Sequence, residues 1–324
     1  MGGLTSRPIV IFSALGTTIG GACVIKFAAG GQLYDSKIRA DNKTIIITGA
    51  NCGIGKETAR ELAQRGAKVI MACRDLQKCE TARKDIVLKT KNKYVYCRHL
   101  DLASQDCIRR FVEQFNKEFD RLDVLINNAG VMRCPHMKTK EGIELQLGVN
   151  HMGHFLLTNL LLEKLKISAP SRIVTVSSIA HQRGTINKTD LNSEKEYKPN
   201  VAYEQSKLAN VLFNLELSKR LKDTGVTANC LHPGIVDTEI FRHMSFAKSS
   251  FTGYILRPLI WPFIRTPLQG SQTTLFAALD ESLEKVTGQY LVDSKIHEPS
   301  EHGKDTETAQ WLWAVSEKWT RLTD

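Results

Sequence analysis

The sequence lacks the patterns that mark disulfide-stapled and zinc-binding proteins. Its eight cysteines include no Cys-x-x-Cys pair and no zinc-ligand spacing, and several fall in stretches typical of buried strands. Scattered cysteines of this kind predict thiols in a reducing compartment rather than a disulfide framework. The chain also has no internal repeat, no low-complexity tract and no linker rich in proline, glycine and serine. We therefore expect one folded body rather than a string of modules.

Acidic residues are too few to balance the basic ones. The chain has 324 residues, of which 44 are Lys or Arg and 34 are Asp or Glu, giving a formal charge of +10. With 42% hydrophobic residues it is too apolar to be disordered. The basic excess suits nucleic acid, an acidic membrane surface or an anionic ligand. No basic helix with interleaved aromatic residues occurs, so we expect no nucleic-acid partner.

A stretch without any charge lies close to the N-terminus, at residues 8–25. At about 1.5 Å per residue it spans roughly 27 Å, enough for a thin hydrocarbon core. We expect residues 1–42 to form a membrane anchor with a basic flank; a cleaved signal peptide and a buried helix are the alternatives. More basic residues follow the stretch than precede it, which predicts a body on the cytosolic side or its equivalent. The endoplasmic reticulum membrane, facing the cytosol, and the mitochondrial inner membrane both suit such an anchor.

From Lys43 onward, short apolar runs alternate with helical patterns. This alternation predicts a doubly wound parallel sheet of seven strands with helices on both faces, the α/β architecture of a Rossmann fold. We expect it to form a single domain over residues 43–324 that ends in a C-terminal helix. The expected strands are 44–48, 68–73, 95–99, 124–127, 172–177, 226–231 and, more weakly, 289–292; the expected helices are 56–65, 76–89, 105–119, 153–166 and 202–223.

The first expected strand runs into the sequence Gly49-Ala-Asn-Cys-Gly53-Ile-Gly55-Lys56. Glycines at such a turn allow a pyrophosphate to approach the backbone, and the following helix points its amides and positive dipole end at the phosphates. A nucleoside-triphosphate loop is excluded because Ala50 and Glu57 stand where it needs Gly and Ser or Thr. A glycine turn with only a structural role is the alternative.

Arg74 follows the second expected strand and indicates which dinucleotide binds. An acidic residue there binds a ribose 2′-hydroxyl, whereas an arginine accommodates a 2′-phosphate. Together with Lys56 from the glycine turn, Arg74 favours NADP(H). The adjacent Asp75 keeps NAD(H) open, and Arg74 as an ordinary solvated charge is a further alternative.

Several motifs occur in a fixed order: Thr48-Gly49-x-x-x-Gly53-x-Gly55, Asn127-Asn-Ala-Gly130, Ser178, Tyr203-x-x-x-Lys207 and Pro233-Gly234. In this order the chain resembles the short-chain dehydrogenase/reductase superfamily. Ser178 and Tyr203 lie 25 positions apart. This long spacing, and the segments 130–136, 149–155 and 160–166, are similar to the retinol dehydrogenase branch. We expect the extra polar segment, residues 183–192, to be a loop over the cleft.

Reduction of a carbonyl needs a proton donor at its oxygen. A tyrosine can donate, and Lys207 lies one helical turn from Tyr203, where its charge, with that of an oxidised nicotinamide, would lower the tyrosine pKa. Ser178, at the end of a strand, would bind and orient the substrate oxygen. The resemblance implies that Asn150 supports a proton relay to the lysine; an ordinary capping or core amide is the alternative. The expected catalytic residues are therefore Asn150, Ser178, Tyr203 and Lys207.

The resemblance also implies NADPH-dependent reduction of all-trans-retinal or a similar apolar aldehyde, reversible in principle. Reduction of ketosteroids or lipid-derived aldehydes is one alternative, and a low-turnover NADPH-binding scaffold is another. The histidines give no metal site, and the oligomeric state stays open, with a homodimer as one alternative. The implied cofactor contacts are Gly49, Asn51, Cys52, Gly53, Ile54, Gly55, Lys56, Arg74, Asp101, Leu102, Asn128, Ala129, Gly130, Tyr203, Lys207, Pro233, Gly234 and Thr238.

Two apolar segments in the last third suit a lipid substrate. Residues 254–264 are aromatic and interrupted by prolines, so we expect a tunnel lining or bilayer contact, with a core-packing lid as the alternative. Trp311, Val315 and Trp319 recur at helical spacing, which favours docking against the core over a membrane-surface role.

Overall fold

The computed structural model describes Gly30, residues 33–239 and residues 264–322. The expected anchor at residues 8–25 lies outside these residues, and so does all of the apolar segment 254–264 except Ile264. Within the described ranges, no helix combines the length and apolar character needed to cross a membrane.

In the described part of the chain, eight strands form one sheet, in the order β3-β2-β1-β4-β5-β6-β7-β8. The neighbours from β3 to β7 pair in parallel, which confirms the doubly wound parallel sheet, and β8 runs antiparallel to β7. The sequence analysis missed β8 because its three residues are all exposed and carry no hydrophobic pattern. The strands are β1 (Thr44–Thr48), β2 (Lys68–Cys73), β3 (Val95–His99), β4 (Val124–Asn127), β5 (Ser171–Val176), β6 (Val226–His232), β7 (Tyr290–Val292) and β8 (Lys295–His297).

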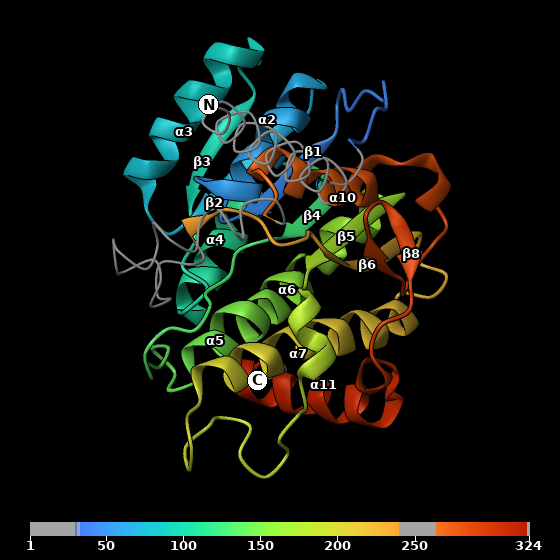
Figure 1. The fold of residues 1–324 in the computed structure, drawn as a ribbon. Coiled ribbons are helices and arrows are strands. Elements are labelled where there is room, and N and C mark those ends of the chain that lie inside the picture. The colour runs from blue at the N-terminus through green and yellow to red at the C-terminus, as the bar shows by residue number, and fades with distance from the viewer. Residues whose placement is uncertain (1–29, 31–32, 240–263, 323–324) are drawn as a thin grey trace, which may run out of the picture.

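Helices cover both faces of the sheet (Figure 1). One layer consists of α2 (Gly53–Gln64), α3 (Leu76–Thr90) and α10 (Pro267–Leu279). The other consists of α4 (Gln105–Glu118), α6 (Gly153–Ile167) and α7 (Pro199–Arg220), with α11 (Thr306–Thr320) packed on α7. Shorter helical turns are α5 (Leu145–Leu147), η1 (Gly148–Met152), η2 (Ile179–Arg183), η5 (Glu281–Leu283) and η6 (Glu301–Lys304).

The central strand β1 explains why the strands show no polar alternation. All five of its residues are buried. Ile45 and Ile47 belong to the core beneath α2, α3 and α10, whereas Ile46 belongs to the core on the α4 and α6 side. Successive side chains point to opposite faces of a strand, so a sheet covered on both faces needs apolar residues at every position.

The C-terminal helix α11 docks on the α7 layer. The expected stripe of Trp311, Val315 and Trp319 packs, partly buried, against a cluster that includes Leu208 and Leu212 of α7. The loop over residues 184–198 lies beside this stripe: Leu191 is buried in the same cluster, and Gln205 of α7 donates to its carbonyl at 3.0 Å. The extra segment is therefore a loop, as expected, but it contacts α7 and α11 rather than lining the cleft described below.

The residues before β1 run along the outside of the α2–α10 layer. The Tyr34 amide donates to the Gln272 side chain at 2.9 Å, and the Tyr34 ring meets Phe276 edge-on at 5.8 Å. Arg65 at the end of α2 donates to the carbonyl of Ile38 at 2.9 Å. The chain therefore enters the sheet from the side opposite α7 and α11.

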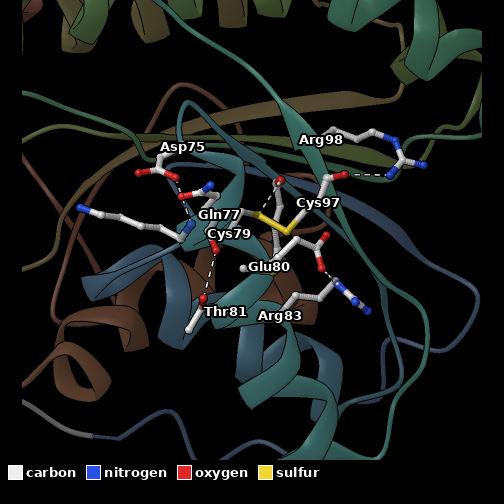
Figure 2. Close-up of a disulfide and its surroundings, with 10 residues drawn as sticks. Asp75, Gln77, Cys79, Glu80, Thr81, Arg83, Cys97 and Arg98 are labelled. Atoms are coloured by element: carbon white, nitrogen blue, oxygen red, sulfur yellow. Dashed lines mark hydrogen bonds and ion pairs between the residues drawn. A yellow bond between two sulfur atoms is a disulfide. The ribbon is translucent and has the colours of Figure 1, made fainter.

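Two cysteines are joined, contrary to the prediction that all eight are thiols. Cys79 in the first turns of α3 forms a disulfide with Cys97 on β3 (Figure 2). The half-cystines are 18 residues apart and meet only because α3 folds back onto the strand that follows it. No local spacing in the sequence reveals such a contact. Cys73, Cys107 and Cys230 are thiols, as expected.

We expect a dithiol reductant to destabilise the wild-type protein. Opening the Cys79–Cys97 link restores chain entropy to the unfolded state and should lower the free energy of unfolding by about 3 kcal/mol for a loop of this size. Urea unfolding, followed by circular dichroism with and without the reductant, measures the change. The Cys79→Ser variant should have a lower free energy of unfolding than the wild type, and the reductant should not change it. An unchanged wild-type midpoint in reductant would contradict the prediction.

Candidate active site

The glycine turn after β1 is shaped for a close ligand. Gly49 and Gly53 adopt positive φ angles of 66° and 55°, a region that favours glycine. A Cβ on Gly55 would stand 2.5 Å from the carbonyl oxygen of Gly49, so the helix start packs against the turn without any side chain between them. Helix α2 begins at Gly53, earlier than the expected Lys56, and its first amides therefore belong to the turn itself.

A cleft of about 360 Å³ opens at this turn. It lies between the neighbouring parallel strands β1 and β4, where the strand order across the sheet reverses. From β1 the chain continues to β2 and β3 on one side, and from β4 it continues to β5 and β6 on the other. Most of the expected cofactor contacts line it: Gly49, Asn51, Cys52, Gly53, Ile54, Gly55, Arg74, Asp101, Leu102, Asn128, Ala129, Gly130 and Thr238. The lining also includes Asp75, Lys78, Val131, Leu145, Val149 and Glu239.

Thr48 joins the two strand ends at the cleft. Its hydroxyl oxygen accepts from the backbone amides of Asn128 and Ala129, both at 2.9 Å. The Asn128 side chain donates back to the Thr48 carbonyl at 2.8 Å. These bonds hold the end of β4 against the glycine turn, so both walls of the cleft keep a fixed separation.

Basic side chains gather at the end of the cleft beyond β2. Arg74 and Lys78 both line it, and among the described residues no carboxylate forms an ion pair with either. The Asp75 carboxylate accepts from the Lys78 amide at 3.0 Å and caps α3 (Figure 2). Lys78, which the sequence analysis missed, could have been found from its place in the first turn of a helix beside Arg74. Lys56 instead pairs with Asp85 of α3 at 2.7 Å and does not line the cleft.

The expected catalytic side chains meet at the other end, around Gly130. Tyr203 and Lys207 lie on the same side of α7, with the Lys207 ammonium 5.8 Å from the Tyr203 ring centre. A Cβ on Gly130 would stand 3.3 Å from Asn150 Oδ1 and 3.7 Å from Lys207 Nζ. Gly130 also lines the cleft, so this cluster borders the cofactor cradle. Lys207 donates to the carbonyl of Val176, at the end of β5, at 3.1 Å.

The structure distinguishes the two adjacent serines after β5. Ser177 is buried, and its hydroxyl donates to the Lys207 carbonyl at 2.8 Å, which pins α7 to the sheet. Ser178 caps the start of η2, and its side chain forms the hydrogen bond to Tyr203 that lowers the tyrosine pKa. Ser178 is thus the serine in reach of the tyrosine hydroxyl.

Asn150 lies in η1, a π-helical turn ahead of α6. Its side chain accepts from the Val131 amide at 2.8 Å and donates to the Val131 carbonyl at 3.0 Å. The side-chain amide of Asn150 also donates to the hydroxyl of Ser206, which lies next to Lys207 on α7, at 2.9 Å. Asn150 therefore ties the cleft wall after β4 to the catalytic helix.

Burial dominates the electrostatics of the catalytic pair. It raises the pKa of Tyr203 to about 12, although the Ser178 hydrogen bond and the Arg133 charge lower this pKa. It also lowers the pKa of Lys207 to about 8. The sequence analysis assigned the lowering of the tyrosine pKa to Lys207, with help from an oxidised nicotinamide. In the structure the Tyr203 pKa is instead raised overall, and the charge that opposes this rise is that of Arg133, which the sequence analysis did not consider.

A buried glutamine holds Arg133 in place. Arg133 has a φ angle of 51°, and its amide donates to the side chain of Gln146 at 2.7 Å. Gln146 in turn donates to the Tyr197 hydroxyl at 2.9 Å and to the Pro199 carbonyl, at the start of α7, at 3.0 Å. The loop that carries Arg133 is thereby fixed to the helix that carries Tyr203. No local sequence pattern signals this contact.

Five expected cofactor residues lie outside the cleft lining: Lys56, the catalytic pair Tyr203 and Lys207, and the adjacent Pro233 and Gly234. Gly234 follows β6 with a φ angle of 89° and packs against the Arg265 side chain, which also donates to the Pro233 carbonyl at 3.4 Å. Thr238, four residues after Gly234, does line the cleft, and a Cβ on Gly53 would stand 2.9 Å from its methyl group. The segment after β6 therefore reaches the cradle through Thr238.

The sheet order, the glycine cradle at the strand reversal and the Ser–Tyr–Lys cluster define a nucleotide-dependent oxidoreductase. Residues 43–248 match the model of the short chain dehydrogenase family, and the chain belongs to this family. It is 50% identical to human retinol dehydrogenase 13 over 312 residues, covering 96% of this chain and 94% of that protein. It is 52% identical to human retinol dehydrogenase 12 over 291 residues, covering 90% of each. The resemblance inferred from the motifs is confirmed.

Solved structures share the fold. The crystal structure of an uncharacterized protein from Mycobacterium Paratuberculosis aligns with a TM-score of 0.71 at 38% identity, covering 90% of this chain and 98% of that one. A structure described as an NAD(P) dependent gluconate 5-dehydrogenase from Beutenbergia cavernae, with NADP bound at low occupancy, aligns with a TM-score of 0.63 at 25% identity, covering 80% and 97%.

We expect Arg133→Met to shift the pH profile of alcohol oxidation to higher pH. Loss of the cation raises the Tyr203 pKa, so less tyrosinate is present at a given pH below that pKa. A shift of half to one pH unit would slow oxidation at neutral pH by about three- to tenfold. Initial rates between pH 6 and 10 measure the profile. Arg98→Met, whose parent residue pairs with Glu118 at the edge of the sheet, is the control. Superimposable profiles for Arg133→Met and the wild type would refute the assignment.

Proposed function

We propose that this protein is an NADP(H)-dependent oxidoreductase that interconverts an apolar aldehyde and its alcohol, with reduction of all-trans-retinal to retinol as its main reaction. One observation carries the proposal. Ser178, Tyr203, Lys207 and Asn150 converge on Gly130, at the border of a cleft built on a glycine turn. The names of the relatives at 50–52% identity supply the retinoid as substrate.

The residues present fit a nicotinamide dinucleotide. The glycines leave a cradle that a Cβ at Gly55 would fill, and the amides that begin α2 face it. The pyrophosphate would lie against Gly53–Gly55, and the nicotinamide end against Asn128–Gly130 and Thr238. When bound, the reduced nicotinamide supplies a hydride to the carbonyl carbon.

Tyr203 is the proton donor at the substrate oxygen. With a pKa of about 12 its hydroxyl is protonated at neutral pH, as reduction of an aldehyde requires. Ser178, hydrogen-bonded to Tyr203, would share the substrate oxygen and orient it. In the reverse direction the tyrosinate must accept the alcohol proton, so every cation near Tyr203 favours oxidation.

Lys207 would serve the same site in two ways. Its ammonium is buried and donates to the Val176 carbonyl, which places it between the strand end and Gly130. From there it can bind the nicotinamide ribose, and together with the charge of a bound oxidised nicotinamide its ammonium would favour the tyrosinate. Asn150 holds the wall on which the ribose and nicotinamide would rest through its contacts to Val131 and Ser206.

The preference for NADP(H) over NAD(H) rests on the basic end of the cleft. Arg74 and Lys78 line it, and the Asp75 carboxylate is engaged in capping α3. Two cations that form no ion pair with a carboxylate of the described residues suit a 2′-phosphate. Lys56 is paired with Asp85, so we assign the phosphate contact to Arg74 and Lys78 instead.

The N-terminal part of the chain is proposed as the membrane anchor and basic flank, residues 1–42, ahead of a catalytic domain over residues 43–324. Residues 33–40 lie along the α2–α10 face, so an anchor that precedes them would leave the body from that side. Membranes of the endoplasmic reticulum and the mitochondrion remain the two candidates.

We expect Arg74→Ala to weaken NADPH binding by about ten- to a hundredfold and to leave NADH binding nearly unchanged. The arginine would contact only the 2′-phosphate, and a charge-assisted contact of this kind contributes about 1.5–3 kcal/mol. Quenching of protein fluorescence measures both dissociation constants. Arg83→Ala, on the nearby helix α3 and paired with Glu80, should change neither (Figure 2). Equal losses for both dinucleotides would rule out a 2′-phosphate role.

We expect Tyr203→Phe to lower kcat for retinal reduction by at least about a hundredfold, because the proton donor is lost. The dissociation constant for NADPH should stay within about threefold of the wild-type value, since the cradle is untouched. Detergent-solubilised protein, assayed with retinal, a ketosteroid and a lipid-derived aldehyde, also tests the substrate class. Normal turnover by the variant would refute the catalytic assignment. A wild type that binds NADPH but reduces none of the three would favour the scaffold alternative.

A further inference from the structure

His154, in the first turn of α6, lies between the two halves of the site. Its side chain is buried, with 1% of its surface exposed. Its Nδ1 lies 3.0 Å from the backbone carbonyl oxygen of Asn150, and its Nε2 lies 2.9 Å from the hydroxyl oxygen of Thr48. The imidazole therefore connects a catalytic residue on η1 with the residue that joins β1 to β4.

The partners determine where the ring carries its proton. A carbonyl oxygen can only accept, so Nδ1 must donate to Asn150. Nε2 of the neutral ring is then an acceptor, and the Thr48 hydroxyl donates to it. The Thr48 oxygen keeps its lone pairs for the amides of Asn128 and Ala129, which donate to it at 2.9 Å. Every polar group in this chain of contacts has a partner of the correct kind.

The environment keeps the ring neutral. Burial, with a smaller contribution from the charge of Lys207, lowers the pKa of His154 to about 4 despite the opposing hydrogen bond to Asn150. At neutral pH one donor and one acceptor are therefore present on the ring. A phenylalanine or leucine of similar bulk could fill the space but could neither donate to the Asn150 backbone carbonyl nor accept from the Thr48 hydroxyl.

Each end of this bridge controls one part of the site. Asn150 places its Oδ1 beside Gly130 and its amide on Val131 and Ser206. Thr48 places Asn128 and Ala129, which line the cofactor cleft. A shift at either end would alter the spacing between the cofactor wall and the catalytic helix.

We propose that His154 is a positioning residue, whose bridge from the Asn150 carbonyl to the Thr48 hydroxyl holds the catalytic cluster and the cofactor wall in register. The inference rests on the proposed NADP(H) reaction and adds a residue that touches neither substrate nor cofactor.

Three substitutions separate the two ends of the bridge. An asparagine amide at position 154 stands near the place of Nδ1 and can donate to Asn150 but does not reach Thr48. A glutamine amide stands near the place of Nε2 and can accept from Thr48 but leaves the Asn150 carbonyl without its donor. Leucine removes both contacts. The NADPH dissociation constant is measured by fluorescence and kcat by retinal reduction, for each variant and for the wild type.

The bridge predicts a crossed pattern. His154→Gln should keep the NADPH dissociation constant near the wild-type value and lose about 5- to 30-fold in kcat. His154→Asn should keep kcat at saturating NADPH near the wild-type value and lose a similar factor in NADPH binding. His154→Leu should lose both. A loss of general packing would instead lower the melting temperature of all three without separating the two parameters.

His151 provides the matched control. It lies on η1 beside Asn150, is also 1% exposed, and burial lowers its pKa to about 3, but its Nε2 contacts Ser316 of α11 at 2.9 Å rather than the site. His151→Leu should lower the melting temperature and leave both parameters nearly unchanged. If Asn and Gln at position 154 give the same pattern, the bridge is refuted. A wild type that neither binds NADPH nor reduces retinal would overturn the proposed function itself.

Discussion

The site depends on the opposite directions that the chain takes across the sheet after β1 and after β4. These strands are neighbours in the sheet, but the helices that follow them cover opposite faces, so a cleft must open between their carboxyl ends. A cleft of this origin would leave backbone groups at both strand ends without partners. Thr48 supplies partners there, because its hydroxyl accepts from the two amides that directly follow β4 and donates to His154. The cofactor wall is therefore positioned by the same side chain that satisfies the strand ends, and it cannot shift without exposing buried polar groups.

Burial and charge oppose each other at the catalytic helix. Tyr203 and Lys207 are nearly inaccessible, which disfavours both the tyrosinate and the ammonium and moves their pKa values toward the neutral forms. A protonated tyrosine suits aldehyde reduction, whereas alcohol oxidation needs compensating positive charge. Arg133 provides such charge from the loop after β4, and Gln146 fixes that loop to the start of α7. The balance between the two directions of the reaction is thus set partly outside the Tyr–Lys pair.

Residues whose roles depend on local backbone geometry could be predicted from the sequence. The glycine turn, the Tyr203–Lys207 spacing and the seven parallel strands follow from short patterns, and the strand bounds agree within one or two residues. Contacts between distant segments could not be predicted. The Cys79–Cys97 disulfide, the Lys56–Asp85 pair and the Gln146 contact to Pro199 each join elements that meet only in the folded chain. Lys56 illustrates the limit, because its position beside the glycines suggested a phosphate contact, but the side chain leaves the turn toward α3. The sequence analysis gave the histidines no metal site, but the carbonyls that His154 and His181 bind depend on the tertiary packing.

Those carbonyls reveal a common arrangement at two of the catalytic residues, Ser178 and Asn150. His181 accepts from the Ser300 amide at Nε2, so its Nδ1 must carry the hydrogen that it donates to the Ser178 carbonyl at 2.7 Å. His154 donates to the Asn150 carbonyl in the same way. Burial lowers the pKa of both rings, which keeps one nitrogen available as an acceptor for a second segment. A neutral imidazole is the one ring side chain that can donate at one edge and accept at the other, and each ring therefore joins a catalytic backbone to a distant element. For Ser178 that element is the segment at Ser300 before α11, so the C-terminal part of the chain contributes to the site without lining it.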